Sequence, residues 1–251
     1  MMEIINQQLN ELKLSGIKSA LQRQLEQPNL YNEQSFEERL NLLLTNEIDA
    51  RNERKISRLI KQAKFRLGAS ISDLTITKER NIDPSEIRSL AQGHWVKRHQ
   101  NILVTGATGC GKTYLACALG HEHCQQGLSV FYVRLKELLE SLFLAQADGS
   151  YRRLILKLAK FDLLILDDWG LEPLTAQQRS DLLELIDARY DKKSMLIVSQ
   201  LPIENWYKMI GESTHADAIL DRLIHSSVKI NLKGESMRKR LNNLTDGDHL
   251  S

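Results

Sequence analysis

The amino-acid sequence predicts an α/β protein in which helices cover a parallel β-sheet, preceded by an all-helical N-terminal region. Three observations lead to this fold class. From about residue 100 onward, short apolar runs alternate with helix-length segments. A glycine-rich loop joins the first of these runs to the helix-compatible segment that follows it. Residues 1–66 contain only one glycine and one proline, Gly16 and Pro28. This alternation is typical of parallel sheets, whereas the early region favours helices.

The N-terminal region ends in a basic helix. Apolar residues such as Leu9 and Leu12 recur there at helical spacing. The stretch 51–66 carries seven basic residues and one acid, Glu53, which gives a local charge of +6. Cations at this spacing share one helix face and can lie along a phosphate backbone. The alternative is a solvated face on a helix that binds a protein partner. The predicted DNA-binding residues of this helix are Arg51, Arg54, Lys55, Arg58 and Lys61.

A linker follows the basic helix and leads to the main domain. Glycine, serine and aspartate interrupt it, and Pro84 fits the first turn of a helix that Asp83 caps. We predict a helical domain over 1–67, a linker over 68–95 and the α/β domain over 96–251.

The glycine-rich loop has the pattern G-x-x-x-x-G-K-T. It follows the apolar run 102–104 and precedes the helix-compatible run 114–126. Glycines let the backbone amides and a helix N-terminus surround a phosphate group, so this context predicts a nucleoside triphosphate site. Lys112 would reach the β- and γ-phosphates, and the Thr113 hydroxyl would bind Mg²⁺. The predicted nucleotide-binding residues are Gly106, Ala107, Thr108, Gly109, Cys110, Gly111, Lys112, Thr113 and Tyr114.

Trp95, just upstream of the first predicted strand of the α/β domain, is expected either near the adenine base or in the core.

A second motif supports the first. The apolar strand 163–166 ends in Asp167 and Asp168, as a Walker B strand does. The C-terminal end of a buried parallel strand faces the phosphate crevice, where Asp167 would hold Mg²⁺ and Asp168 would orient the attacking water. The alternative is an ordinary core strand followed by a solvated acidic turn.

The remaining apolar runs complete the predicted sheet. Strands are expected at 128–133, 195–199 and 228–232, and helices at 135–147, 151–160, 175–190 and 216–223. Ser199 or Gln200, at the end of one strand, would sense the γ-phosphate or its water; the alternative is a simple strand-ending turn before Pro202. About fifty residues follow Gln200, so we expect little or no C-terminal lid domain.

Composition limits the other function classes. The net charge is only +2, so a nucleic-acid surface must come from local segregation of charge. No apolar run approaches the ~18 residues that span a bilayer, and the polar start lacks a signal-peptide core. We therefore expect a cytoplasmic location and no membrane partner. The three cysteines lack a Cys-x-x-Cys pair, which favours reduced thiols over a metal site.

Over about four-fifths of its length, from residue 37 to 239, the chain resembles the IstB transposition-helper ATPases. These belong to the AAA+ initiator clade and are related to DnaC-type helicase loaders. The stretches that carry the resemblance are the basic helix around Arg54, 101–118, 162–170, 187–190, 218–223 and 234–238. The resemblance implies ATP-dependent assembly on DNA, with Arg222 as an arginine finger that reaches a neighbouring subunit and Arg238 as a sensor near the nucleotide.

Each of these carried-over roles has an alternative. Arg222 could pair with Asp221 or Asp217 on its own helix. Arg189 is a second candidate for an intersubunit cation, and an intramolecular ion pair is its alternative. Arg238 lies in a basic tail that could contact DNA. Arg134 and Lys136 follow the second predicted strand, and related initiators use this side of the assembly to track the DNA backbone. Both are therefore predicted DNA contacts, and a solvated helix start is the alternative for each.

The sequence also departs from the AAA+ pattern at two positions. Asp168 replaces the usual Glu, and Gln200 replaces the usual Asn of the sensor strand. The shorter Asp168 side chain suggests slow, partner-stimulated hydrolysis, with Lys112, Asp167, Asp168, Gln200 and Arg222 as the predicted catalytic residues.

These residues and the resemblance together predict an ATP- and Mg²⁺-dependent oligomer. It would bind duplex DNA largely without sequence preference and select a target for its cognate transposase. The alternatives are a replicative helicase loader, which would favour single-stranded DNA, and a nucleotide-dependent adaptor whose N-terminal helices bind protein.

Overall fold

The computed structural model describes residues 1–74, 80–211 and 213–234, and the chain forms two compact units, Met1–Arg58 and Leu59–Ser251. The first unit is entirely helical, as predicted. It contains α1 (Met2–Glu11), α2 (Ser15–Glu26), the 3₁₀ turn η1 (Pro28–Leu30) and most of α3 (Phe36–Ala63), which continues into the second unit. The predicted domain boundaries at 67 and 95 stay predictions.

Close helix contact in the first unit explains its single glycine. A Cβ atom on Gly16 of α2 would lie 2.5 Å from the carbonyl oxygen of Asn46 on α3, so only glycine fits there. The buried carboxylate of Glu47, also on α3, accepts hydrogen bonds from the backbone amides of Gly16 (2.7 Å) and Ile17 (3.2 Å). These bonds satisfy free N–H groups in the first turn of α2.

The second unit is built on a five-stranded parallel sheet, which confirms the predicted fold class. Its strands are β1 (Asn101–Gly106), β2 (Val130–Arg134), β3 (Leu163–Trp169), β4 (Ser194–Ser199) and β5 (Ser227–Leu232). They are arranged in the order β2-β3-β4-β1-β5, and all four pairings are parallel. The carboxyl ends of all strands therefore lie along one edge of the sheet.

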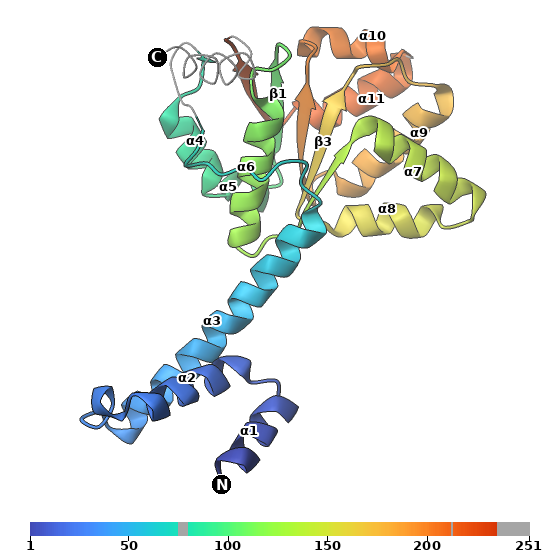
Figure 1. Ribbon diagram of the computed structural model, residues 1–251. Helices are drawn as coiled ribbons and strands as arrows, with labels where there is room; N and C mark the ends of the chain where they lie inside the picture. Colours follow the sequence, from blue (N-terminus) through green and yellow to red (C-terminus); the bar gives the residue numbers. More distant parts are fainter. Residues whose placement is uncertain (75–79, 212, 235–251) are drawn as a thin grey trace, which may run out of the picture. The chain divides into compact units, whose positions relative to one another are not determined.

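Helices cover both faces of this sheet (Figure 1). On one side lie α4 (Pro84–Ala91), α5 (His94–Lys97) and α6 (Lys112–Gln125). On the other lie α7 (Leu135–Ala147), α8 (Tyr151–Lys160), α9 (Ala176–Arg189), α10 (Trp206–Ile210) and α11 (Ser213–Ile224). Alternate strand residues point to opposite sides: Ile102 and Val104 pack with the first group, Leu103 with the second. The result is two hydrophobic cores separated by the sheet.

Local sequence signals set several helix ends. The Asp83 side chain accepts a hydrogen bond from the Ser85 amide, as the predicted cap of α4 requires. Thr175 and Gln178 form a capping box at the start of α9. Only η3 (Ile203–Asn205), α10, α11 and β5 follow β4 in the described part of the chain, and they complete the α/β unit without forming a separate lid.

Trp95 belongs to the core. The residue is 4% exposed, and its indole N–H donates to the carbonyl oxygen of Leu90. The centre of its ring lies 5.4 Å from the centre of the His123 ring. Of the two expected positions for Trp95, the structure therefore shows the core one.

The buried His123 makes the stability of the second unit pH-dependent. Burial lowers the pKa of His123 to about 4, and the Gln126 side chain partly offsets this effect. The unfolded chain takes up the proton near pH 6.5, so stability is full above that pH and falls as the pH drops from 6.5 towards 4. The loss is at most about 3 kcal/mol.

His123→Phe should flatten this pH dependence, because phenylalanine cannot take up a proton. Urea unfolding at several pH values, followed by tryptophan fluorescence, measures the free energy of unfolding of the second unit, because all three tryptophans lie in that unit. The exposed His94→Gln variant serves as a control and should keep the wild-type slope. An equally steep slope in His123→Phe would contradict this explanation.

Candidate nucleotide-binding site

The glycine-rich loop connects the end of β1 to the start of α6. Gly106 has a φ of +144°, and a Cβ atom there would lie 2.2 Å from the carbonyl oxygen of Leu232 on β5. Gly111, at the N-cap of α6, has a φ of +90°. Both positions need the left-handed backbone that glycine adopts without strain, so these glycines shape the loop against its neighbours.

Lys112 lies inside the loop. Its side chain is largely buried, and its ammonium group donates to the carbonyl oxygens of Gly106 (2.8 Å) and Ala107 (2.7 Å). A cation held at the centre of a backbone loop beside a helix N-terminus is suited to binding phosphate oxygens.

Asp167 is the most connected polar side chain of the site. Its carboxylate is 1% exposed and accepts hydrogen bonds from the hydroxyls of Thr113 and Tyr132, each at 2.7 Å. Its other oxygen accepts from the Asp168 amide, also at 2.7 Å. Residues from α6, β2 and β3 thus meet at one carboxylate. The Thr113 hydroxyl and the Asp167 carboxylate are neighbouring hard oxygen ligands, a set that Mg²⁺ prefers.

Asp168 departs from regular strand geometry. Its φ is +58°, and the pairing of β3 with β4 is irregular between Leu166 and Trp169. Such a bulge re-aims a side chain, and strained backbone is common at functional sites. Burial, followed by the charge of Asp167, raises the pKa of Asp168, while nearby Arg66, Arg134 and Lys112 act in the opposite direction.

Of the two residues expected to follow β4 into the site, only Gln200 contacts the loop. Thr108 donates a hydrogen bond to the Gln200 side-chain oxygen at 2.6 Å. Ser199 is fully buried and donates instead to the carbonyl oxygen of Trp169. Gln200 also lines a cleft of about 660 Å³ between the loop and the end of β5, within the usual range for small-molecule sites.

Two site residues are absent from the sequence-based prediction. Arg80 is 6% exposed and donates to the Cys110 carbonyl oxygen in the loop at 2.6 Å. Tyr132 donates to Asp167 because β2 pairs with β3. No motif identifies Arg80. Tyr132 lies near the end of a predicted strand. That position would have indicated a contact with Asp167 only if the strand order had been known.

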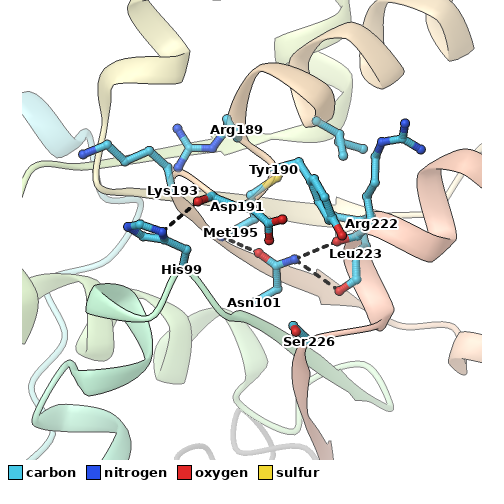
Figure 2. Close-up of a pocket in the computed structure, with 11 residues that line it drawn as sticks. His99, Asn101, Arg189, Tyr190, Asp191, Lys193, Met195, Arg222, Leu223 and Ser226 are labelled. Atoms are coloured by element: carbon cyan, nitrogen blue, oxygen red, sulfur yellow. Dashed lines mark hydrogen bonds between the residues drawn. The ribbon is translucent and has the colours of Figure 1, made fainter.

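Arg222 lies beside the strand starts, at the edge of the sheet opposite the glycine-rich loop, and Figure 2 shows it with the residues around it. It lines a cavity together with residues at or next to the strand starts, including Asn101, Met195 and Ser226. Asn101 donates to the Arg222 carbonyl oxygen at 3.2 Å, while the Arg222 guanidinium points away from Asn101. Because the phosphate-binding loop follows the other end of β1, Arg222 cannot reach the loop of its own chain.

The side chain of Arg222 pairs with an acid on a different helix from the one expected. Its partner is Asp187 on α9, not Asp221 or Asp217. The guanidinium also lies 5.9 Å from the centre of the Tyr190 ring, a cation–π distance. Its side chain is 30% exposed, so it remains accessible.

Arg189 is not available to a neighbouring subunit. It is fully buried and donates to the carbonyl oxygens of Leu158 and Ser194, each at 2.6 Å. Burial lowers its pKa to about 9. Within the described part of the chain Arg189 forms no ion pair, and it joins α8, α9 and β4 through backbone carbonyls instead.

Most of the predicted DNA-binding cations are exposed, Arg134 is partly buried, and several have acidic neighbours. Glu47 lies four residues before the basic stretch, and it pairs with Arg51 at 2.8 Å and with Arg54 at 3.4 Å. Lys55, Arg58 and Lys61 are exposed on α3. On the second unit, Arg134 pairs with Glu137 and Lys136 with Glu172. Arg238 lies outside the described residues.

Two kinds of feature are absent from the described residues. These residues contain no group of three or more His, Cys, Asp or Glu side chains that could hold a metal ion. A cation at Thr113 and Asp167 would therefore take its other ligands from water or a bound phosphate. No helix in the described ranges is long and apolar enough to cross a membrane.

The fold and site define a P-loop protein of the AAA+ class, with a Walker A loop after β1 and a Walker B strand at β3. The family described as IstB-like ATP binding protein matches residues 7–245. This chain belongs to that family. It is 44% identical over 232 residues to the insertion sequence ATP-binding protein y4pL of Sinorhizobium fredii, a match that covers 92% of this chain and 94% of y4pL.

Solved structures support the same fold. AMPPCP-bound DnaA from Aquifex aeolicus superposes with a TM-score of 0.59 at 17% identity, over 74% of this chain and 57% of that one. The DnaC helicase loader gives a TM-score of 0.52 at 21% identity, over 59% of this chain and 87% of that one. At these identities the likeness shows the fold alone.

Gly106→Ala should greatly weaken nucleotide binding, because the new methyl group would collide with the Leu232 backbone and displace the loop. We expect at least a tenfold loss of affinity, or about 1.4 kcal/mol, measured with a fluorescent ATP analogue. Gly149→Ala is the matched control. Gly149 also has positive φ (+74°) but open space around it, so it should lose about 1–2 kcal/mol of stability and retain wild-type affinity. Equal affinities in the two variants would contradict the proposed role of the Leu232 contact.

Proposed function

We propose that this protein is an ATP-dependent, DNA-binding ATPase that assembles on duplex DNA and helps a cognate transposase select its target. One observation carries the proposal: Lys112, Thr113 and Asp167 converge at the carboxyl edge of the sheet in a chain of the IstB-like family. The loop geometry supports ATP as the nucleotide, and the name of the family agrees with it.

The residues present fit a Mg²⁺–ATP complex. Lys112 would exchange its loop carbonyls for the β- and γ-phosphates, and the amides at the start of α6 would surround the β-phosphate. Thr113 and Asp167 would hold the metal ion, Asp167 directly or through its hydration shell. When bound, Mg²⁺ neutralises charge that develops on the phosphates.

Hydrolysis would need residues from both edges of the sheet. Asp168 would orient the attacking water, and Gln200 would contact the γ-phosphate side of the site. Arg222 lies at the edge of the sheet opposite the phosphate-binding loop of its own chain, but its side chain is partly exposed. It would therefore act as an arginine finger for a neighbouring subunit. Such a finger typically accelerates hydrolysis about 10³- to 10⁵-fold. The nucleotide would then control assembly, because it binds where two subunits meet.

The basic stretch of α3 supports DNA binding. Its cations are exposed, and three of them, Lys55, Arg58 and Lys61, are spaced along the helix for contact with phosphates. Contacts to the backbone carry little sequence information, so duplex binding would be largely sequence-independent. Arg134 and Lys136 would add contacts on the second unit. The insertion-sequence names of the relatives support a transposase as the partner.

Lys112→Ala should abolish ATP-dependent assembly, because the nucleotide would lose its main cationic ligand. Sedimentation of the protein with a duplex, with and without ATP, measures this assembly. The control variant Lys157→Ala removes an exposed lysine on α8 and should assemble like wild type. ATP-dependent complexes of equal size in Lys112→Ala would contradict the proposal.

Arg54→Glu with Arg58→Glu should weaken duplex binding at least about tenfold. Loss of two phosphate contacts should also reduce the slope of log affinity against log salt by about 2. The control Arg152→Glu with Arg153→Glu makes the same charge change on α8, where both residues are exposed. If the two double variants lose equal affinity, the basic stretch is not the DNA contact, and a protein-binding adaptor becomes the better explanation.

A replicative helicase loader is the second candidate, supported by the structural likeness to the DnaC loader. It would favour single-stranded over duplex DNA and bind a helicase instead of a transposase. Sedimentation with matched single and double strands separates the two functions.

A further inference from the structure

Tyr132 places a buried hydroxyl group next to Asp167, the carboxylate proposed to bind the metal ion. Its side chain is 5% exposed, and its hydroxyl donates to Asp167 at 2.7 Å, as the Thr113 hydroxyl does. Thr113 must turn towards a bound metal ion, whereas Tyr132 is fixed on β2 directly beside β3. Of the two hydroxyl donors to this carboxylate, Tyr132 is the one that can keep its bond while Asp167 holds the ion.

The other side of Tyr132 faces a cationic groove. The groove has a volume of about 400 Å³, and its charged lining consists of Lys64, Arg66, Arg134 and Glu137. Three cations against one carboxylate leave an excess of positive charge, and Glu137 is already paired with Arg134. Lys64 and Arg66 are exposed. A phosphodiester group is the ligand chemistry that suits this lining.

Arg66 connects the groove to the catalytic carboxylates. Arg66 and Tyr132 line the same groove, and the Tyr132 hydroxyl donates to Asp167. In sequence, Lys64 and Arg66 directly follow α3, the helix proposed to bind DNA. A phosphate that pairs with Arg66 would therefore change the surroundings of the Tyr132–Asp167 hydrogen bond.

We propose that Tyr132 is a positioning residue that orients Asp167 for Mg²⁺ and links this groove to the ATP site, so that a DNA phosphate held by Arg66 changes the rate of hydrolysis. The effect of DNA on hydrolysis rests on the proposed DNA-binding ATPase function, whereas the role of Tyr132 in orienting Asp167 does not. Hydrogen-bond partners of metal ligands fix the ligand's orientation, and their loss typically costs 10- to 100-fold in metal affinity.

The first experiment measures metal binding without hydrolysis. A fluorescent, non-hydrolysable ATP analogue is titrated with Mg²⁺ in wild type, Tyr132→Phe and Tyr151→Phe. Tyr151 is the matched control, because its hydroxyl also donates to carboxylates, Asp181 (3.1 Å) and Glu184 (2.9 Å), away from the site. Tyr132→Phe should need about tenfold more Mg²⁺ for half-maximal binding, and Tyr151→Phe should match wild type. An unchanged Mg²⁺ requirement in Tyr132→Phe overturns the positioning role.

The second experiment measures the link to the groove. Hydrolysis rates are compared without DNA and with saturating duplex for wild type, Tyr132→Phe, Arg66→Gln and the exposed control Arg152→Gln. We expect duplex to change the wild-type rate at least about fivefold, the lower end of ordinary coupling between sites. The change should persist in Arg152→Gln and be largely lost in Tyr132→Phe and Arg66→Gln.

The outcomes separate this inference from the proposed function. If wild type binds duplex but its rate is unchanged, or if Arg66→Gln keeps the full change, the link is overturned while DNA binding stands. If wild type binds no DNA, the proposed function fails together with the link, and the Mg²⁺ titration still decides the role of Tyr132. Tryptophan fluorescence of each variant confirms that the second unit is folded.

Discussion

The hydrogen bonds to the Asp167 carboxylate are the constraint on which the rest of the site depends. They come from Thr113 on α6, Tyr132 on β2 and the Asp168 backbone on β3. Three elements can meet at one buried carboxylate only because the parallel strands end along the same edge of the sheet. An unpaired buried carboxylate would be costly, so these bonds stabilise the fold and also set the geometry in which a metal ion would be held.

The same parallel arrangement separates the two halves of the proposed catalytic centre. The phosphate-binding loop lies at the carboxyl edge of the sheet, and Arg222 lies beside the strand starts. In the proposed arrangement, each chain would supply a nucleotide site to one neighbour's Arg222 and its own Arg222 to another neighbour's site. Asp187 and Tyr190 hold Arg222 within its own subunit. A neighbour that offered a γ-phosphate would compete with these contacts, which gives a physical reason for hydrolysis to depend on assembly.

Much of this organisation was predictable from the sequence because its signals are local. The loop glycines, the strand that ends in Asp167 and the Asp83 cap each depend on a few adjacent residues. The contacts made by Tyr132, Arg189 and Arg222 depend on strand order and helix packing, which a single sequence does not reveal. Glu47 was missed for a simpler reason: it lies just outside the basic stretch, yet one helical turn brings it next to Arg51.

The most direct test of the proposed shared site mixes two variants on duplex DNA and measures ATP hydrolysis. Lys112→Ala lacks the phosphate-binding lysine, and Arg222→Ala lacks the finger. Each alone should be nearly inactive. Mixed together, some junctions would combine an intact loop from the Arg222→Ala subunit with Arg222 from the Lys112→Ala subunit, so activity should reappear. A mixture no more active than its components, or an Arg222→Ala protein as active as wild type, would contradict a site shared between subunits.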